Sequence, residues 1–83
     1  MPAHLDTRQA LAAFGQQLRR VRLAMQISQR ELARRSKVGH RFISETELGR
    51  ENPSLATIVL LANGLGCEVV DLFKPKSGSN LLA

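Results

Sequence analysis

The sequence predicts a compact all-α fold, a bundle of five helices. Three observations support this prediction: apolar residues recur at helical spacing, capping residues open the periodic segments, and glycine or proline closes them. A chain of 83 residues is long enough for one domain. The chain contains no internal repeat, so we expect a single core shared by all the helices.

The first helix is predicted to begin at Asp6 or Thr7 and to run to about Met25. Asp6 and Gln9 have the spacing of a capping box, in which each side chain bonds to the backbone of the other residue. Its core face is one apolar stripe that steps by three and four residues: Leu11, Phe14, Leu18, Val21 and Met25. The stripe predicts that this face packs against the remaining helices.

Two shorter helices are predicted over residues 28–50. Ser28 and Glu31 have the spacing of a second capping box, which opens the first of them. Residues 37–39 include a glycine and interrupt the helical pattern, which then resumes. Two short helices joined by a tight turn form a helix-turn-helix, a motif that places its second helix in the major groove of DNA.

The last two helices close the predicted bundle. The fourth begins near Pro53 or Ser54, spans Leu55 to about Asn63, and has this core stripe: Leu55, Ile58, Leu61, Ala62 and Leu65. Gly64 and Gly66 are predicted to end it. A short fifth helix covers residues 68–73. Residues 74–83 lack apolar periodicity and are predicted to form a flexible tail.

Six positions of the helix-turn-helix, followed by an Asn-Pro-Ser-Leu run, share one register: Gln29, Ala33, Val38, Ile43, Glu47, Gly49 and 52–55. In this register the chain resembles the Cro and lambdoid phage repressor (XRE) type of helix-turn-helix. The resemblance implies a lambda-repressor-like DNA-binding domain at residues 14–73, and residues 1–13 as an extension that contains the start of the first helix. In length and in its Phe-Ile-Ser run, 42–44, the chain is also similar to restriction-modification controller proteins.

The connections before and after the first helix of the motif depart from this family's pattern at three positions. Lys37 stands where the family usually has a glycine in the turn, and Gly39 stands where serine or threonine usually caps the next helix. Gln26 likewise replaces the glycine that usually follows the first helix. A left-handed backbone costs a residue with a side chain about 1 kcal/mol. We therefore expect Gly39 to take up the strain of the turn in place of Lys37.

A buried ion pair is expected between the first and third helices. Arg22 lies beside the apolar stripe, and Glu47 lies on the inward side of its own helix, four residues after Ile43. Because unpaired charges seldom face a core, the simplest account is that these two side chains meet. The resemblance implies the same pair. The alternative is two surface charges that do not meet.

Positive charge gathers around the helix-turn-helix. The net charge of the chain is +5, and residues 14–50 hold nine Lys or Arg against three Glu, which is +6. Such a face suits a polyanion, because each neutralised phosphate releases a counterion, although an ordinary solvated surface is an equal alternative on charge alone. The expected phosphate contacts, which position the protein but specify no sequence, are Ser28, Gln29, Lys37, Arg50 and Asn52.

Double-stranded DNA is the expected partner of the third helix. The outward positions that can reach base edges are His40, Arg41, Ser44 and Glu45. Arg41 fits guanine bidentately, and His40 is expected to read a purine acceptor or to contact a phosphate. Glu45 is expected either to accept from a cytosine amine or to steady Arg41, four residues away. Phe42 either contacts a thymine methyl group or, as we favour, packs at the helix junction.

Leu60 and Val70 fall off the core stripes and predict an exposed apolar patch. We expect this patch to form a two-fold homodimer that binds a palindromic operator, because a domain this small contacts few base pairs alone. Two alternatives remain. The two residues are scattered surface side chains, or the chain is an antitoxin-like or adaptor module that binds a protein partner such as a toxin or the transcription machinery.

Other classes of function lack their residues. Catalysis is not expected, because no nucleophile, base and orienting group fall together and there is no glycine-rich phosphate loop. No cofactor or metal is expected, since Cys67 is the only cysteine and reads as a small core residue, and His4 and His40 lie far apart. Without a membrane-spanning stretch or signal peptide, we expect a cytoplasmic protein, associated with the nucleoid of a bacterium or phage host.

Overall fold

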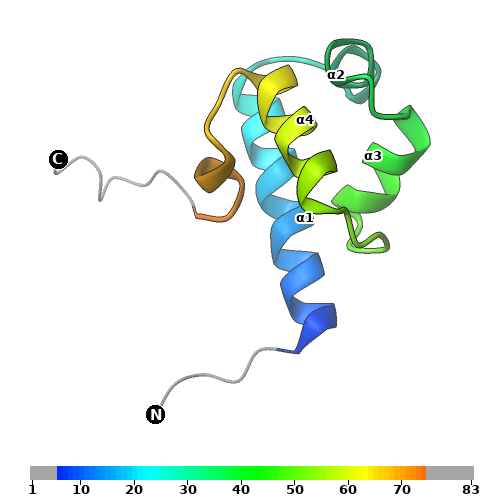
Figure 1. Ribbon diagram of the computed structural model, residues 1–83, viewed down its shortest axis with the longest axis vertical. Helices are drawn as coiled ribbons and strands as arrows, with labels where there is room; N and C mark the ends of the chain where they lie inside the picture. Colours follow the sequence, from blue (N-terminus) through cyan, green and yellow to red (C-terminus); the bar gives the residue numbers. More distant parts are fainter. Residues whose placement is uncertain (1–5, 75–83) are drawn as a thin grey trace, which may run out of the picture.

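The computed structural model describes residues 6–74, which form four α-helices and one 3-10 helix (Figure 1). In chain order these are α1 (Thr7–Ala24), α2 (Gln29–Ser36), α3 (His40–Glu47), α4 (Leu55–Leu65) and η1 (Val69–Leu72). The predicted all-helical fold is confirmed for this part of the chain. Of the predicted extension at residues 1–13, residues 7–13 belong to α1, whereas residues 1–5 lie outside the described residues, as does the predicted tail beyond Lys74.

The predicted count of five α-helices is wrong, because the last element is a single 3-10 turn. Asp71 N–H donates to the carbonyl of Glu68 at 3.0 Å, and Phe73 N–H donates to the carbonyl of Val70 at 3.0 Å. Both bonds span three residues, as in a 3-10 helix. The segment is too short to build the four-residue ladder of an α-helix, and its role is to place buried Leu72 in the core.

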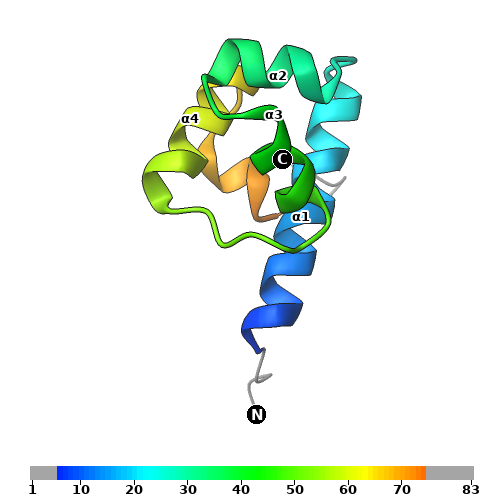
Figure 2. The ribbon, with the colours of Figure 1, turned by 90° about the vertical axis from the view of Figure 1, so that its right-hand side faces the viewer.

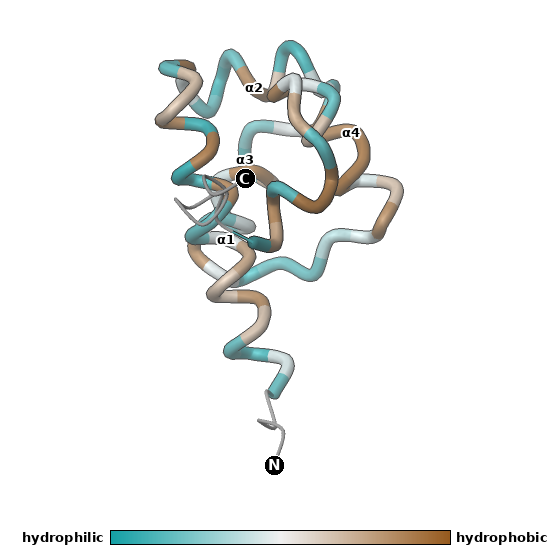
Figure 3. The backbone as a smooth tube through the Cα atoms, turned by 90° about the vertical axis from the view of Figure 1, so that its left-hand side faces the viewer, coloured by the Kyte–Doolittle hydropathy of each residue, from teal (hydrophilic) through white to brown (hydrophobic). Residues whose placement is uncertain are grey.

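The core draws on every helical element. Its buried apolar residues are Phe14, Leu18, Leu32, Val38, Ile43, Ile58, Leu61, Ala62, Leu65 and Leu72. α4 is the most hydrophobic of the α-helices and packs against α2 and η1 (Figure 3). α1 packs against α3 and η1, while its first turns project beyond the other helices (Figures 1 and 2). The helix-turn-helix is therefore held between α1 and α4.

Two residues of the predicted stripes are exposed rather than buried. Met25 is 48% exposed because α1 ends at Ala24 and the chain turns at the next residues. Leu55 is 68% exposed, and the buried residue at this end of α4 is Pro53. Both residues lie at the end of a helix, where no neighbouring element covers the side chain, although the helical spacing places them on the core stripe.

The helix boundaries follow the capping residues. Asp6 and Gln9 form the predicted reciprocal box, with backbone-to-side-chain bonds of 2.8 and 3.2 Å. Ser54 caps α4 by accepting from Thr57 N–H at 3.1 Å. α4 continues to Leu65, so Gly64 does not end the helix as predicted. Gly64 instead lies where α4 meets α2, since a Cβ there would come within 2.9 Å of the Ser36 Cβ.

The strain of the helix-turn-helix turn lies on Lys37. Lys37 has φ +66° and Gln26 has φ +61°, so both residues that replace family glycines adopt the left-handed conformation. Gly39 has φ −60°, and the expectation that it would absorb this strain is wrong. The end of α2 requires a left-handed residue directly at its C-cap, before the chain reaches Gly39.

Candidate nucleic-acid interface

A buried ion pair holds α3 against α1. Arg22 Nε donates to Glu47 Oε2 at 2.6 Å, and Arg22 Nη2 donates to Glu47 Oε1 at 3.0 Å. A third donor, Arg22 Nη1, bonds to the Ile27 carbonyl at 2.9 Å. This is the pair that the sequence predicts, with both side chains over 90% buried. Its planar, bidentate geometry fixes the rotation of α3 about its axis and so decides which side chains of α3 face outward.

The backbones of α1 and α3 touch beside this pair. A Cβ on Gly15 would clash with the Thr46 carbonyl oxygen and lie 2.8 Å from that of Glu47. Only glycine permits this approach. Sequence reasoning gave Gly15 no role, because a lone glycine in a helix does not reveal what crosses it.

The start of α2 joins the same network. Gln29 Nε2 donates to Glu47 Oε1 at 3.0 Å, so the side-chain amide of this predicted phosphate contact bonds to the ion pair. Ser28 caps α2 by accepting from Glu31 N–H at 2.9 Å. The predicted second half of the capping box is absent, because the Glu31 carboxylate binds Arg34 and Arg35 instead, at 2.5 and 2.8 Å. Hydrogen bonds from these arginines, Arg34 first, lower the pKa of Glu31 from 4.5 to about 2.

The four residues predicted to reach base edges share one outward face of α3. Arg41 is exposed, and the other three are partly exposed: His40, Ser44 and Glu45. Ile43, Thr46 and Glu47 occupy the opposite, buried face. Phe42 is partly buried against the core, in agreement with the packing role that we favoured.

The predicted alternative partner of Glu45 was Arg41, but its ion pair is with Arg50, at 3.6 Å between Oε1 and Nη1. The end of α3 brings these two side chains together. Arg50 N–H donates to the Glu45 carbonyl at 2.9 Å, and Gly49 N–H donates to the Thr46 carbonyl at 3.0 Å. With φ +78° at Gly49, this is a Schellman motif, which folds the chain back over the last turn of the helix.

The remaining predicted phosphate contacts lie in two different surroundings. Lys37 and His40 line a shallow surface hollow together with Arg30 and Arg34. Sequence reasoning assigned Arg30 and Arg34 no role, although their spacing places them on one side of α2. Asn52 is exposed and lines a smaller hollow of largely apolar character, with residues of α1, α4 and the segment after η1.

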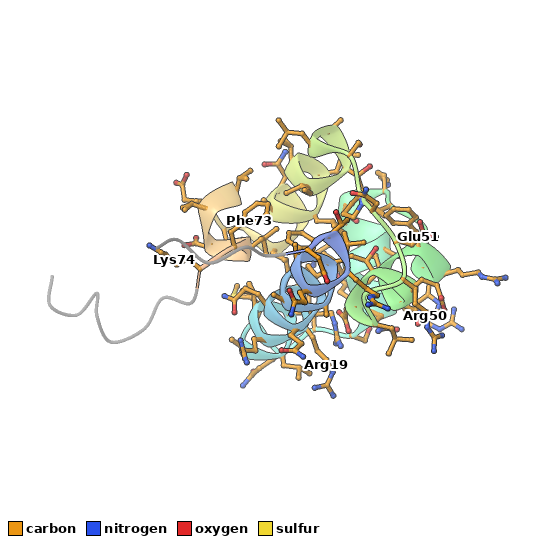
Figure 4. All side chains as sticks on the ribbon, turned by 90° about the horizontal axis from the view of Figure 1, so that it is seen from below. Arg19, Arg50, Glu51, Phe73 and Lys74 are labelled. Atoms are coloured by element: carbon orange, nitrogen blue, oxygen red, sulfur yellow. The ribbon has the colours of Figure 1, made fainter. Side chains whose placement is uncertain are left out.

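The segment after α3 and the segment after η1 lie on different sides of the molecule. Seen along α1, Arg50 and Glu51 lie on one side of this helix, and Phe73 and Lys74 lie on the other (Figure 4). The Phe73 ring packs on the Phe14 ring, with 5.1 Å between centroids, yet Phe73 is 57% exposed. The sequence had not singled out Phe73 as a surface residue.

The described residues contain neither a metal-binding cluster nor a membrane-spanning helix. No three His, Cys, Asp or Glu side chains come together as metal ligands within residues 6–74. Over the same residues, no helix has the length and hydropathy required to cross a membrane.

Known proteins share this arrangement. A helix-turn-helix family model (HTH_3) matches residues 18–72. The restriction-modification controller protein C.AhdI from Aeromonas hydrophila is similar in structure, with a TM-score of 0.74, 40% identity, and coverage of 76% of this chain and 96% of its own. A mutant of the controller protein C.Esp1396I has a TM-score of 0.72 and 26% identity, with 77% and 81% covered.

A third similar structure is the hypothetical transcription factor NHTF from Neisseria, with a TM-score of 0.77 and 30% identity over 100% of this chain and 97% of its own. No curated protein sequence matches the chain. The family match covers more than half of the 83 residues and includes α2, α3 and the turn between them. The chain therefore belongs to the XRE-type helix-turn-helix family, the family that its residues resemble.

Proposed function

We propose that this protein is a transcriptional regulator that binds double-stranded DNA sequence-specifically, as a homodimer on a palindromic operator. The observation that carries the proposal is the outward face of α3, which the buried Arg22–Glu47 pair holds in one orientation. A helix fixed in this way can present the same side chains to base edges each time it binds. The similarity to C.AhdI supports a role as a restriction-modification controller.

In the proposed complex, the N-terminal turn of α3 leads into the major groove. Arg41, exposed in this turn, reads guanine through O6 and N7, while His40 reads a purine acceptor or contacts a phosphate. Ser44 lies one turn further along the same face. Glu45 lies beside it on this face, in an ion pair with Arg50.

The phosphate contacts flank this helix. At the start of α2, Ser28 accepts from the Glu31 N–H. The N–H groups of Gln29 and Arg30 lie at the positive end of the helix dipole, where they can bind a DNA phosphate. Lys37 in the turn and Arg50 after α3 supply positive charge for the DNA phosphates. We assign exposed Asn52 to the same phosphate backbone. These contacts set the register of the protein on DNA.

The proposed dimer uses the apolar surface of α4 and η1. The exposed apolar residues of these two elements are Leu55, Val59, Leu60 and Val70, and we place Leu60 and Val70 in the interface. A two-fold pairing there would leave both copies of α3 free to reach half-sites whose centres lie about 34 Å apart, one helical turn of DNA. The same surface also suits the second candidate function, an antitoxin-like or adaptor module that binds a different protein. A sizing measurement separates the two, because a stable homodimer occupies this surface.

The first experiment is selection of bound duplexes from a random DNA pool. We expect an inverted repeat, which gives the half-site and its spacing. A pool that converges on no sequence would contradict sequence-specific binding.

Two arginine variants then test the mechanism. Arg41→Ala should cost about 1 to 3 kcal/mol on the selected site, relax discrimination at one base pair per half-site, and change binding to a scrambled duplex little. Arg50→Ala should weaken binding to both duplexes similarly and lower the salt slope by roughly one unit per lost phosphate contact. Titrations on both duplexes at several salt concentrations measure this. Equal losses for Arg41→Ala on both duplexes would show that Arg41 contacts only phosphate.

A further inference from the structure

The pairing of Glu45 with Arg50 changes what Glu45 can do on DNA. Glu45 is the only acidic residue on the outward face of α3, and every other charge on that face favours a polyanion. The Glu45 side chain is 29% exposed, and its carboxylate lies 3.6 Å from the guanidinium of Arg50, whose side chain is 66% exposed. The pair therefore lies at the surface that we propose to face DNA.

Backbone geometry, rather than chance contact of two long side chains, sets this pairing. The Schellman motif at the end of α3 ties the Arg50 N–H to the Glu45 carbonyl at 2.9 Å. This bond holds the backbone of Arg50 beside that of Glu45, and from there the two side chains come within 3.6 Å of one another.

A phosphate that approaches Arg50 must compete with the Glu45 carboxylate. Either the ion pair separates, or two anions come to lie side by side on one guanidinium. Both outcomes reduce the affinity that Arg50 contributes, and neither depends on the base sequence, since the phosphate is present at every step of the duplex.

From this geometry, and on the basis of the proposed DNA-binding function, we propose that Glu45 limits DNA affinity through Arg50 instead of reading a base. Glu45 is then a positioning residue that holds Arg50 back from the DNA backbone. The effect is modest, because an exposed ion pair contributes little, and removing it should tighten binding by about two- to fivefold.

A double-mutant cycle tests this proposal. Wild type, Glu45→Gln, Arg50→Ala and the double variant are titrated on the selected duplex and on a scrambled duplex by fluorescence anisotropy. We expect Glu45→Gln to bind both duplexes about two- to fivefold more tightly, and we expect most of this gain to disappear when Arg50 is alanine. Circular dichroism melts should match wild type, because the pair lies at the surface.

Glu51→Gln is the matched control, because it removes the same charge one residue beyond Arg50 and leaves the Glu45–Arg50 pair in place. Its effect should be smaller, and it should persist in the Arg50→Ala background.

Three results would overturn the proposal while leaving DNA binding intact. If Glu45→Gln weakens binding on the selected duplex alone, Glu45 reads a base. If its gain is the same with Arg50→Ala, Glu45 repels DNA directly and Arg50 plays no part. If it leaves binding to both duplexes unchanged, Glu45 does not limit affinity. A wild-type protein that binds neither duplex would instead refute the proposed function itself.

Discussion

At the scale of single residues, the Arg22–Glu47 pair combines two charges that would each be costly to bury alone. Arg22 donates to both Glu47 oxygens and to the Ile27 carbonyl, and Gln29 gives Glu47 a further bond. Among the described residues, no buried side-chain nitrogen or oxygen lacks a partner. Together these hydrogen bonds offset the free-energy cost of removing the two charges from water. A single contact would not offset it.

Replacing Glu47 by alanine should lower the free energy of unfolding by about 3 kcal/mol or more, because it leaves Arg22 buried without its partner. The double change Arg22→Met with Glu47→Leu should cost much less, since it removes both charges. Urea melts measure both. Glu45→Ala is the control, and loss of that exposed pair should cost under about 1 kcal/mol. A silent Glu47→Ala change would mean that the pair does not stabilise the fold.

Glu31 predicts an acid-dependent loss of stability. The pKa of Glu31 is about 2 in the folded protein, compared with its ordinary value of 4.5. Its bonds to Arg34 and Arg35 therefore stabilise the fold fully above about pH 4.5, and this stabilisation is lost as the pH falls toward 2. Glu31→Gln should therefore flatten this part of the profile of melting temperature against pH. Arg34→Gln should flatten it partly, because Arg34 is the larger cause of the shift. Parallel profiles for Glu31→Gln and wild type between pH 2 and 5 would contradict the assignment.

At the scale of the elements, the turn between α2 and α3 works although its residues are not the preferred ones. Lys37 takes the left-handed conformation at the C-cap of α2, and its N–H donates to the Ala33 carbonyl at 2.9 Å. Gly39 is the N-cap of α3 and has no side chain to cap it. Between these two residues, Val38 is buried in the core and its N–H donates to Ser36 Oγ at 3.1 Å, and both interactions support the turn.

Lys37→Gly should raise the free energy of unfolding by about 1 kcal/mol, because glycine adopts φ +66° without the clash of a Cβ. Gly49→Ala is the reverse control. It should destabilise the fold, since a Cβ there would meet the Ala12 Cα at 3.0 Å in addition to the left-handed strain. Urea melts of both variants measure the difference. If Lys37→Gly proves less stable than wild type, the lysine side chain stabilises the turn by more than the strain it carries.

At the scale of the whole molecule, the arrangement separates two surfaces. The basic surface of α2 and α3 carries the proposed DNA contacts, and the apolar surface of α4 and η1 carries the proposed dimer contact. In Figure 4, Arg50, which follows α3, and Phe73, which follows η1, lie on different sides of α1. We therefore expect a second copy to bind without covering α3.

Leu60→Glu or Val70→Glu should convert the proposed dimer into a helical monomer, because each places a charge in an apolar contact. Light scattering combined with circular dichroism measures mass and helicity together. Leu48→Glu is the control, since Leu48 is 59% exposed but belongs to the end of α3, and its mass should stay that of a dimer. If both test variants remain dimers, the interface lies elsewhere on the molecule.

The sequence by itself determined the features that depend on neighbours along the chain. The capping residues placed the starts of α1 and α2, and helical spacing placed His40, Arg41, Ser44 and Glu45 on one face. It also predicted the Arg22–Glu47 pair, because a charge on an inward face requires a partner. These inferences use only the geometry of a regular helix, which every helix shares.

Only the tertiary structure decided the features that depend on what lies opposite a residue. Gly15 is required where the α3 backbone crosses α1, and Glu45 meets Arg50 because a Schellman motif reverses the chain between them. Leu55 is exposed because Pro53 is the residue that is buried at that end of α4. Periodicity says which way a side chain points along its own helix, but not whether a second element reaches it. That second condition is set by the packing of distant segments, which no local pattern records.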